Sequence, residues 1–133
     1  MRSYFLPLLA LIAAAAPAEA AGGKADPEAV LARALEGRVA GEPVDCINLR
    51  NIRSSQIIDD TAILYDAGGT LYVNRPRGGA ESLDRFDVLV TKSFSSQLCS
   101  IDVVHLYDPV ARFETGFVFL GEFVPYRKPR TER

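Results

Sequence analysis

The chain has 133 residues, and its 15 basic and 17 acidic side chains leave a net charge of −2. The length leaves no room for a second large domain, and a hydrophobic fraction of 48% is too high for a disordered chain. The charge excludes a strongly basic nucleic-acid binder. Two cysteines and one histidine are too few for a zinc site made by protein alone. We therefore expect one globular domain with no cofactor, no metal and no nucleic-acid partner.

Residues 1–20 have the three parts of a secretory signal peptide. Arg2 supplies the positive start, an apolar run covers residues 5–16, and small residues occupy the two positions that a signal peptidase reads. The alternative is a membrane anchor, but a membrane span needs ~20 apolar residues and this run is shorter. The sequence predicts cleavage after Ala20 and a mature chain of residues 21–133, periplasmic or secreted, without a membrane span.

Export would place Cys46 and Cys99 in an oxidising compartment, where paired cysteines usually form a disulfide. Both cysteines lie in apolar stretches that resemble strands. A redox-active pair usually has closely spaced cysteines, and this pair is widely spaced. The sequence therefore predicts one structural disulfide between Cys46 and Cys99, with two separate buried thiols as the alternative.

A helix is predicted over residues 26–38. Asp26 is a good N-cap, Pro27 suits the first helical position, apolar residues recur at helical spacing, and Gly37 supplies a stop. We interpret this helix as packing on an open side or end of a sheet. The alternative is a helix that binds a partner.

Residues 44–126 have the pattern of antiparallel strands joined by short turns. The clearest hairpin surrounds Gly68 and Gly69, which can adopt a positive φ without steric cost. We expect one long strand over residues 98–107. The last segment, residues 116–126, is apolar on both faces in its middle, so we expect it to be central or covered.

The predicted fold class is mainly β. Short turns and the lack of helical patterns between strands favour antiparallel pairing. We expect five to seven strands in a small sheet curled into a barrel or half-barrel, with one short N-terminal helix. Residues 127–133 are polar and are expected to form a mobile tail.

The most distinctive polar cluster is the turn that holds Arg75 and Arg77, with Arg85 eight residues later. Two planar guanidinium groups near exposed backbone N–H groups can hold a carboxylate, phosphate or sulfate. The sequence thus predicts a ligand-binding site at Arg75, Arg77 and Arg85. The alternative is a solvated turn, or salt bridges to the nearby acids Glu81, Asp84 and Asp87.

No recognisable catalytic arrangement is present. Asp59 and Asp60 are adjacent carboxylates, but neighbours on a strand point to opposite faces. His105 is the single histidine, and no nucleophile motif accompanies it. We interpret all three as solvated or structural groups, because an enzyme would need them to converge in one pocket.

Several short motifs are similar to those of a known group of proteins. They are Cys46-Ile47, Ile57-Ile58-Asp59-Asp60-Thr61, Leu71-Tyr72-Val73-Asn74-Arg75, Leu98-Cys99-Ser100 and the closing G-F-V-F-L-G-E-F-V-P-Y. With them the chain resembles a group of small exported proteobacterial proteins that combine C-I, I-D-D, Y-x-N and L-C-S. The resemblance implies a Gram-negative periplasmic setting and carries over no catalytic residues.

Three functional interpretations follow, in order of preference. The first is a non-enzymatic periplasmic domain that binds a protein or a cell-envelope component. The second is a small anion- or ligand-binding module that uses the turn of Arg75 and Arg77. The third is a small enzyme built on Asp59, Asp60 or His105.

Overall fold

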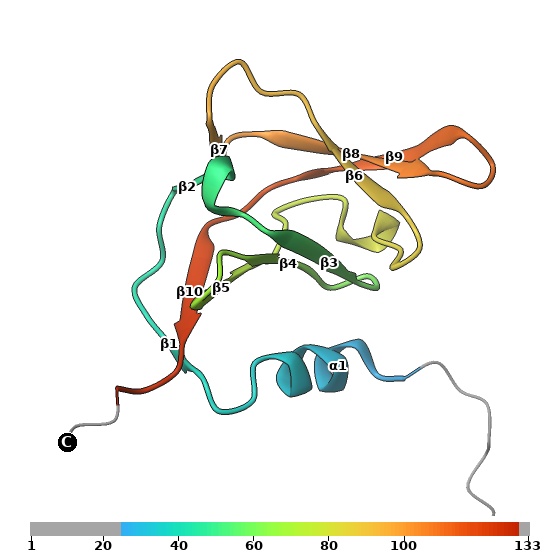
Figure 1. The fold of residues 1–133 in the computed structure, drawn as a ribbon. Coiled ribbons are helices and arrows are strands. Elements are labelled where there is room, and N and C mark those ends of the chain that lie inside the picture. Colours follow the sequence, from blue (N-terminus) through green and yellow to red (C-terminus); the bar gives the residue numbers. More distant parts are fainter. Residues whose placement is uncertain (1–24, 131–133) are drawn as a thin grey trace, which may run out of the picture.

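The computed structural model describes residues 25–130. The predicted signal peptide and the last three residues of the predicted tail lie outside this range. Within the described range, no helix is long and apolar enough to cross a membrane. Figure 1 shows the helices and strands of this part. The elements, in chain order, are α1 (Pro27–Ala34), β1 (Val39–Ala40), β2 (Cys46–Asn48), the 3-10 helix η1 (Leu49–Asn51), β3 (Ser54–Ile58), β4 (Ala62–Asp66), β5 (Thr70–Asn74), the 3-10 helix η2 (Ala80–Ser82), β6 (Val88–Thr91), β7 (Gln97–Cys99), β8 (Val103–Asp108), β9 (Phe113–Phe119) and β10 (Phe123–Arg127).

The strands form three antiparallel sheets. Sheet A has the order β1-β10-β5-β4-β3, sheet B pairs β2 with β7, and sheet C has the order β6-β8-β9. The prediction of a mainly β fold with antiparallel pairing and one N-terminal helix is confirmed. Residues 25–130 form ten strands instead of five to seven, and they form no closed barrel.

Two apolar segments of the sequence are each divided into two strands. A turn at residues 100–102 separates β7 from β8, and the Asp102 carboxylate accepts a hydrogen bond from the Cys99 N–H at 2.7 Å. The prediction of one long strand over residues 98–107 was therefore wrong. Residues 120–122 separate β9 from β10 and carry the chain from sheet C to sheet A.

Helix α1 is shorter than the predicted 26–38 but has the predicted start. The Asp26 carboxylate accepts a hydrogen bond from the Glu28 N–H, and Pro27 occupies the first turn. The helix ends at Ala34, and the chain then turns through Gly37, whose φ is 76°. The predicted packing on a sheet is confirmed, because Leu31 is buried against sheet A.

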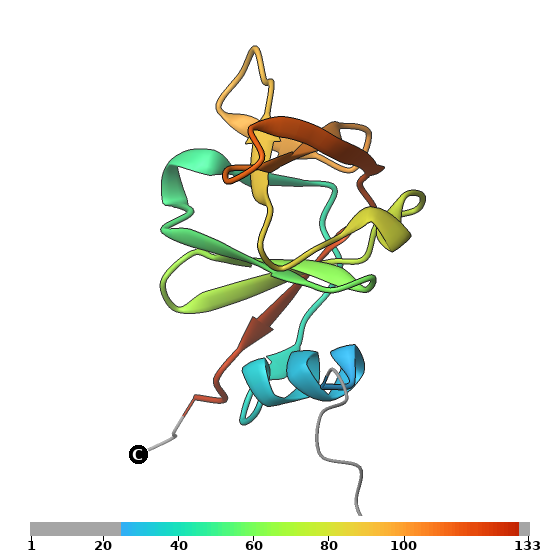
Figure 2. The ribbon, with the colours of Figure 1, turned by 90° about the vertical axis from the view of Figure 1, so that its right-hand side faces the viewer.

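Sheet A lies between α1 on one side and sheets B and C on the other, as Figures 1 and 2 show. An apolar layer covers each of its two faces. The helix-side layer consists of Leu31, Ile58, Ala62, Leu64 and Val73. The main core lies between the sheets and includes Ile47, Ile57, Ile63, Tyr65, Leu98, Val104, Leu106, Val118, Leu120 and Phe123. Four successive residues of β4 are therefore buried, as expected for a strand covered on both faces.

The predicted disulfide between Cys46 and Cys99 is confirmed. The two cysteines stand directly opposite each other in the β2–β7 pair, and their Cα atoms are 4.0 Å apart. The Cys99 N–H donates to Asp102 and not to β2. In an antiparallel sheet, opposite residues that share no backbone hydrogen bonds have the closest Cα atoms, ~4.5 Å apart. The separation therefore lies just below the usual disulfide range of ~4.4–6.8 Å.

Tyr65 gives a first testable prediction. Its hydroxyl is buried and has no hydrogen-bond partner among the described residues, and its ring packs edge-on against Phe123. Tyr65→Phe should therefore leave the free energy of unfolding unchanged or raise it by up to ~1 kcal/mol. Urea unfolding of the variant and of Tyr107→Phe, which changes a partly exposed tyrosine, tests this. A loss above ~1 kcal/mol in Tyr65→Phe alone would reveal a hydrogen bond to the hydroxyl.

The same residue predicts a pH dependence. Burial raises the pKa of Tyr65 above its ordinary value. Above pH ~10 the unfolded chain can ionise this tyrosine while the folded chain keeps it neutral, so folding is disfavoured there. The stability advantage of Tyr65→Phe over the wild type should therefore grow as the pH rises past 10.

Candidate functional site

The three arginines predicted to form a site point to different partners. Arg75 forms a two-pronged ion pair with Glu28 of α1, with Nη1–Oε1 at 2.8 Å and Nη2–Oε2 at 3.0 Å. The Arg75 guanidinium lowers the pKa of Glu28, and Glu28 in turn raises the pKa of Arg75. Both side chains are more than half exposed, so this pair fastens the helix to the surface of the sheet only weakly.

Arg77 supports the backbone of two other segments. Its Nε donates to the Leu120 carbonyl at 2.7 Å, and its Nη2 donates to the Ser100 carbonyl at 3.0 Å. Its own N–H donates to the Phe119 carbonyl. Arg77 therefore joins the turn after β5 to the ends of β7 and β9, and two of its guanidinium N–H groups bond to backbone carbonyls.

Arg85 lies beside Asp59, a residue of a different segment that is 26 positions earlier in the chain. Its Nη1 is 3.6 Å from Asp59 Oδ2, its N–H donates to Asp59 Oδ1, and its guanidinium lies over the Phe86 ring. The predicted competitors Glu81, Asp84 and Asp87 form no ion pair with Arg75, Arg77 or Arg85 in residues 25–130. Instead, Glu28 pairs with Arg75 and Asp59 pairs with Arg85.

The three candidate catalytic residues do not converge. Asp59 binds Arg85, while Asp60 has a positive φ of 55° in the β3–β4 turn and donates its N–H to the Leu83 carbonyl. His105 lies on β8, where its Nδ1 contacts the Glu114 carboxylate. No three histidine, cysteine, aspartate or glutamate side chains within residues 25–130 come together as metal ligands.

Sheet C has an apolar face that no other part of residues 25–130 covers. Alternation places one set of side chains inward, where Val104, Leu106 and Val118 are fully buried. The opposite set, which we call the outer face, consists of Val88, Val90, Val103, His105, Tyr107, Glu114, Phe117 and Phe119. Phe117 and Val88 are each 48% exposed and Phe119 is 46% exposed. Sheets with a free face usually carry polar side chains there, so this composition is unusual.

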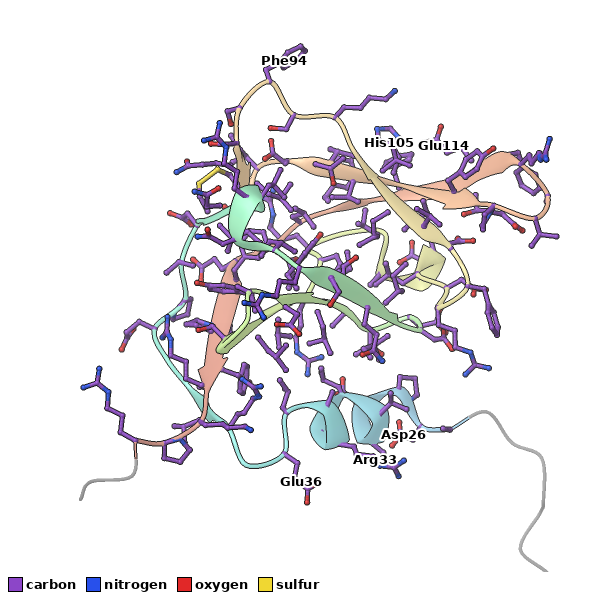
Figure 3. All side chains as sticks on the ribbon, viewed as in Figure 1. Asp26, Arg33, Glu36, Phe94, His105 and Glu114 are labelled. Carbon is purple, nitrogen blue, oxygen red and sulfur yellow. A yellow bond between two sulfur atoms is a disulfide. The ribbon has the colours of Figure 1, made fainter. Side chains whose placement is uncertain are left out.

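The outer face is ordered around its aromatic side chains. The Phe117 and Phe119 rings meet edge to face with centroids 5.5 Å apart, and His105 lies 6.2 Å from Phe117. Figure 3 shows His105 and Glu114 on the side of the molecule opposite to Arg33 of α1 and to Glu36, which follows the helix. The His105–Glu114 contact therefore lies far from α1.

Sequence reasoning expected this strand to be covered. The apolar pattern of residues 117–120 predicted a strand that is central or covered, but β9 lies at the edge of sheet C. Only its end is paired on the other side, through the bridge between Gly78 and Phe119. The inner half of the pattern is buried as expected, while the prediction that both faces are covered was wrong for residues 25–130. The second, outward-facing set of apolar residues in β9 is the sequence signal that could have identified the outer face.

Two cavities border sheet A. A groove of about 460 Å³ lies between β3 and the start of β6, and it contains acids as well as Arg85. A second cavity, of about 420 Å³, lies between η1 and the β4–β5 turn. Arg50 and Arg53 line this second cavity, and no acid is among its lining residues. The predicted arginine site involves neither of these two residues.

The fold and these surfaces define a small disulfide-linked β domain with one docked helix. Comparison with known proteins adds no relative, since no family model, no curated protein and no solved structure matches the chain.

Proposed function

We propose that this protein is an exported, non-enzymatic domain that binds a partner protein through the outer face of sheet C. The observation that carries the proposal is the exposure of Val88, Phe117 and Phe119 on one three-stranded face. Contiguous apolar patches on the surface of soluble domains commonly mark interaction sites. Aromatic side chains at the centre of such a patch are the usual anchors of protein interfaces.

The charge of the outer face favours a protein over a lipid surface. The face contains one acid, Glu114, and a single lysine at its border, Lys92, which lines a shallow pocket with Val90 and Glu114. Binding to anionic lipids usually needs several basic residues around the apolar group. We therefore assign the face to a protein with a complementary apolar surface.

The disulfide supports the exported location. Disulfides persist outside the cytoplasm and are rare within it. The predicted signal peptide and the resemblance to exported proteins give the same location, and the proposed partner is accordingly a periplasmic or envelope protein.

Site-specific photo-crosslinking in the native host tests the binding face. A photoreactive phenylalanine analogue at position 117 should give an adduct of one defined mass. The analogue at position 33, on the exposed side of α1 opposite the face, should give none. Val90→Asp should abolish the adduct, because it places a charge beside the anchor without touching the core.

The possible results of the crosslinking experiment distinguish the proposal from its alternatives. Equal adducts at positions 117 and 33, or no adduct at either, would overturn the proposal. An adduct of twice the protein's own mass would replace the partner protein by a second copy of the chain. With the isolated partner, Phe117→Ala should weaken binding by ~2 kcal/mol, about 30-fold, as expected for a central anchor.

The anion-binding alternative at Arg75 and Arg77 stays a prediction. The contacts of these side chains with Glu28, Leu120 and Ser100 do not favour it, because they leave few donors directed toward a common point.

A further inference from the structure

The cavity between η1 and the β4–β5 turn has the chemistry of an anion site. Arg50 and Arg53 line it together with Thr70 and Tyr72 of β5. Neither arginine forms an ion pair with any acid in the described part of the chain. In contrast, two of the three arginines that the sequence singled out, Arg75 and Arg85, are each paired with an acid.

The fold excludes the nearest acid from this cavity. Asp66 ends β4 next to Tyr65, whose side chain points into the core, so alternation directs Asp66 to the opposite face. Its Oδ1 is also occupied, because it accepts the Gly68 N–H at 2.8 Å. The Arg53 guanidinium packs directly on this turn, with Cζ 3.4 Å from the position of a Cβ on Gly68. Because of the orientation of Asp66 and its bond to Gly68, no acid among the lining residues neutralises the two arginines.

The remaining polar groups of the cavity are mainly donors. Asn48 uses its Oδ1 to accept the Arg50 N–H at 3.0 Å, which leaves its NH₂ group as a donor. Arg127 lies opposite Thr70 in sheet A, and its Nε donates to the Thr70 hydroxyl at 3.1 Å. A third guanidinium thus stands at the edge. A ligand that fits this set must offer several acceptors.

We propose that this cavity binds a hydroxyl-bearing ring that carries an anionic group, such as a sugar phosphate or a uronic acid. Planar guanidinium groups bind phosphate and carboxylate with two parallel hydrogen bonds, and Arg50 and Arg53 hold the anion. The amide of Asn48 and the Thr70 hydroxyl face the ring. The volume of about 420 Å³ lies in the range of small-ligand sites. This site is independent of the outer face of sheet C.

Calorimetric titration tests the site with four probes: glucose 1-phosphate, glucuronic acid, inorganic phosphate and glucose. Binding of the first two, weakening as salt rises, and no heat with glucose are expected. Comparison of the two sugars distinguishes a phosphate from a carboxylate ligand. Absence of heat with both would overturn the proposal, and equal affinity for inorganic phosphate and glucose 1-phosphate would overturn the contribution of the ring.

Matched variants locate the binding. Arg50→Gln with Arg53→Gln should weaken binding at least tenfold without changing the melting temperature, because both side chains are exposed. Arg33→Gln with Arg112→Gln removes the same charge from other exposed positions and should leave binding unchanged. An equal loss in both double variants would mean that net charge alone attracts the anion, which contradicts a defined site.

Arg75→Gln separates this cavity from the arginine turn. Its effect on binding should be small, and a loss larger than that of the Arg50 and Arg53 variant would move the site to the turn. NMR shift changes of the wild-type protein give a readout without any substitution. They should concentrate in residues 48–53 and 67–72, and shifts confined to other residues would overturn the assignment.

Discussion

Replacing Gly121 by alanine should destabilise the domain by about 3 kcal/mol or more, at the upper end of the cost of overpacking. A Cβ at this position would lie 2.4 Å from the Arg75 carbonyl oxygen, which is main chain and cannot rotate away. Gly121 lies in the segment that carries the chain from sheet C to sheet A. Displacing it would separate two sheets.

The Asn74 side chain fixes Gly121 in place through hydrogen bonds to both of its backbone polar groups. Its side chain is fully buried, its Nδ2 donates to the Gly121 carbonyl at 2.7 Å, and its Oδ1 accepts the Gly121 N–H at 2.9 Å. Asn74→Ala would leave two buried backbone groups without partners, at a cost of about 1–3 kcal/mol each. Urea unfolding of Gly121→Ala, Asn74→Ala and the exposed control Asn51→Ala measures these effects. Losses below ~1 kcal/mol in the first two variants would show that the segment relaxes freely.

Removing the disulfide by Cys46→Ala with Cys99→Ala should lower the free energy of unfolding by ~4 kcal/mol on the loop-entropy estimate. The bond joins residues 53 apart in sequence, so the unfolded chain gains much freedom when it is lost. Sheet B consists only of the short strands β2 and β7, and the disulfide joins these two strands covalently.

Reduction supplies the matched control for this prediction. Dithiothreitol should lower the midpoint of unfolding of the wild type to that of the double variant and leave the variant unaffected. A variant as stable as the oxidised protein would contradict the stabilising role.

Local patterns were sufficient to predict the helix start at Asp26, the hairpin around Gly68 and the disulfide. Each depends on residues near in sequence or on the identity of a residue pair. The breaks within residues 98–107 and 116–126 depend on contacts that local patterns do not contain. Asp102 turns the chain by binding the Cys99 N–H, and Gly121 fits against the distant carbonyl of Arg75.

The candidate sites show the same limit. Local acids were the expected partners of Arg75, but its partner is Glu28, 47 residues away. Arg50 and Arg53 were not singled out, because only the folded chain brings the β4–β5 turn to them. A usable signal was present, since residues 46–58 contain two arginines and no acid. The outer face was visible as an apolar pattern, but its exposure depends on the place of β9 in the sheet.

The position of β10 in sheet A determines when the domain can fold. This strand is almost the last part of the described chain, yet it lies inside the sheet, between β5 and the early strand β1. A chain that emerges gradually from its N-terminus can form the β3–β4–β5 meander but has no partner for the other edge of β5. Sheet A can therefore be completed only when β10 is free. Truncation after residue 122 should destabilise the domain strongly, because it removes this strand and Phe123, a fully buried residue of the main core.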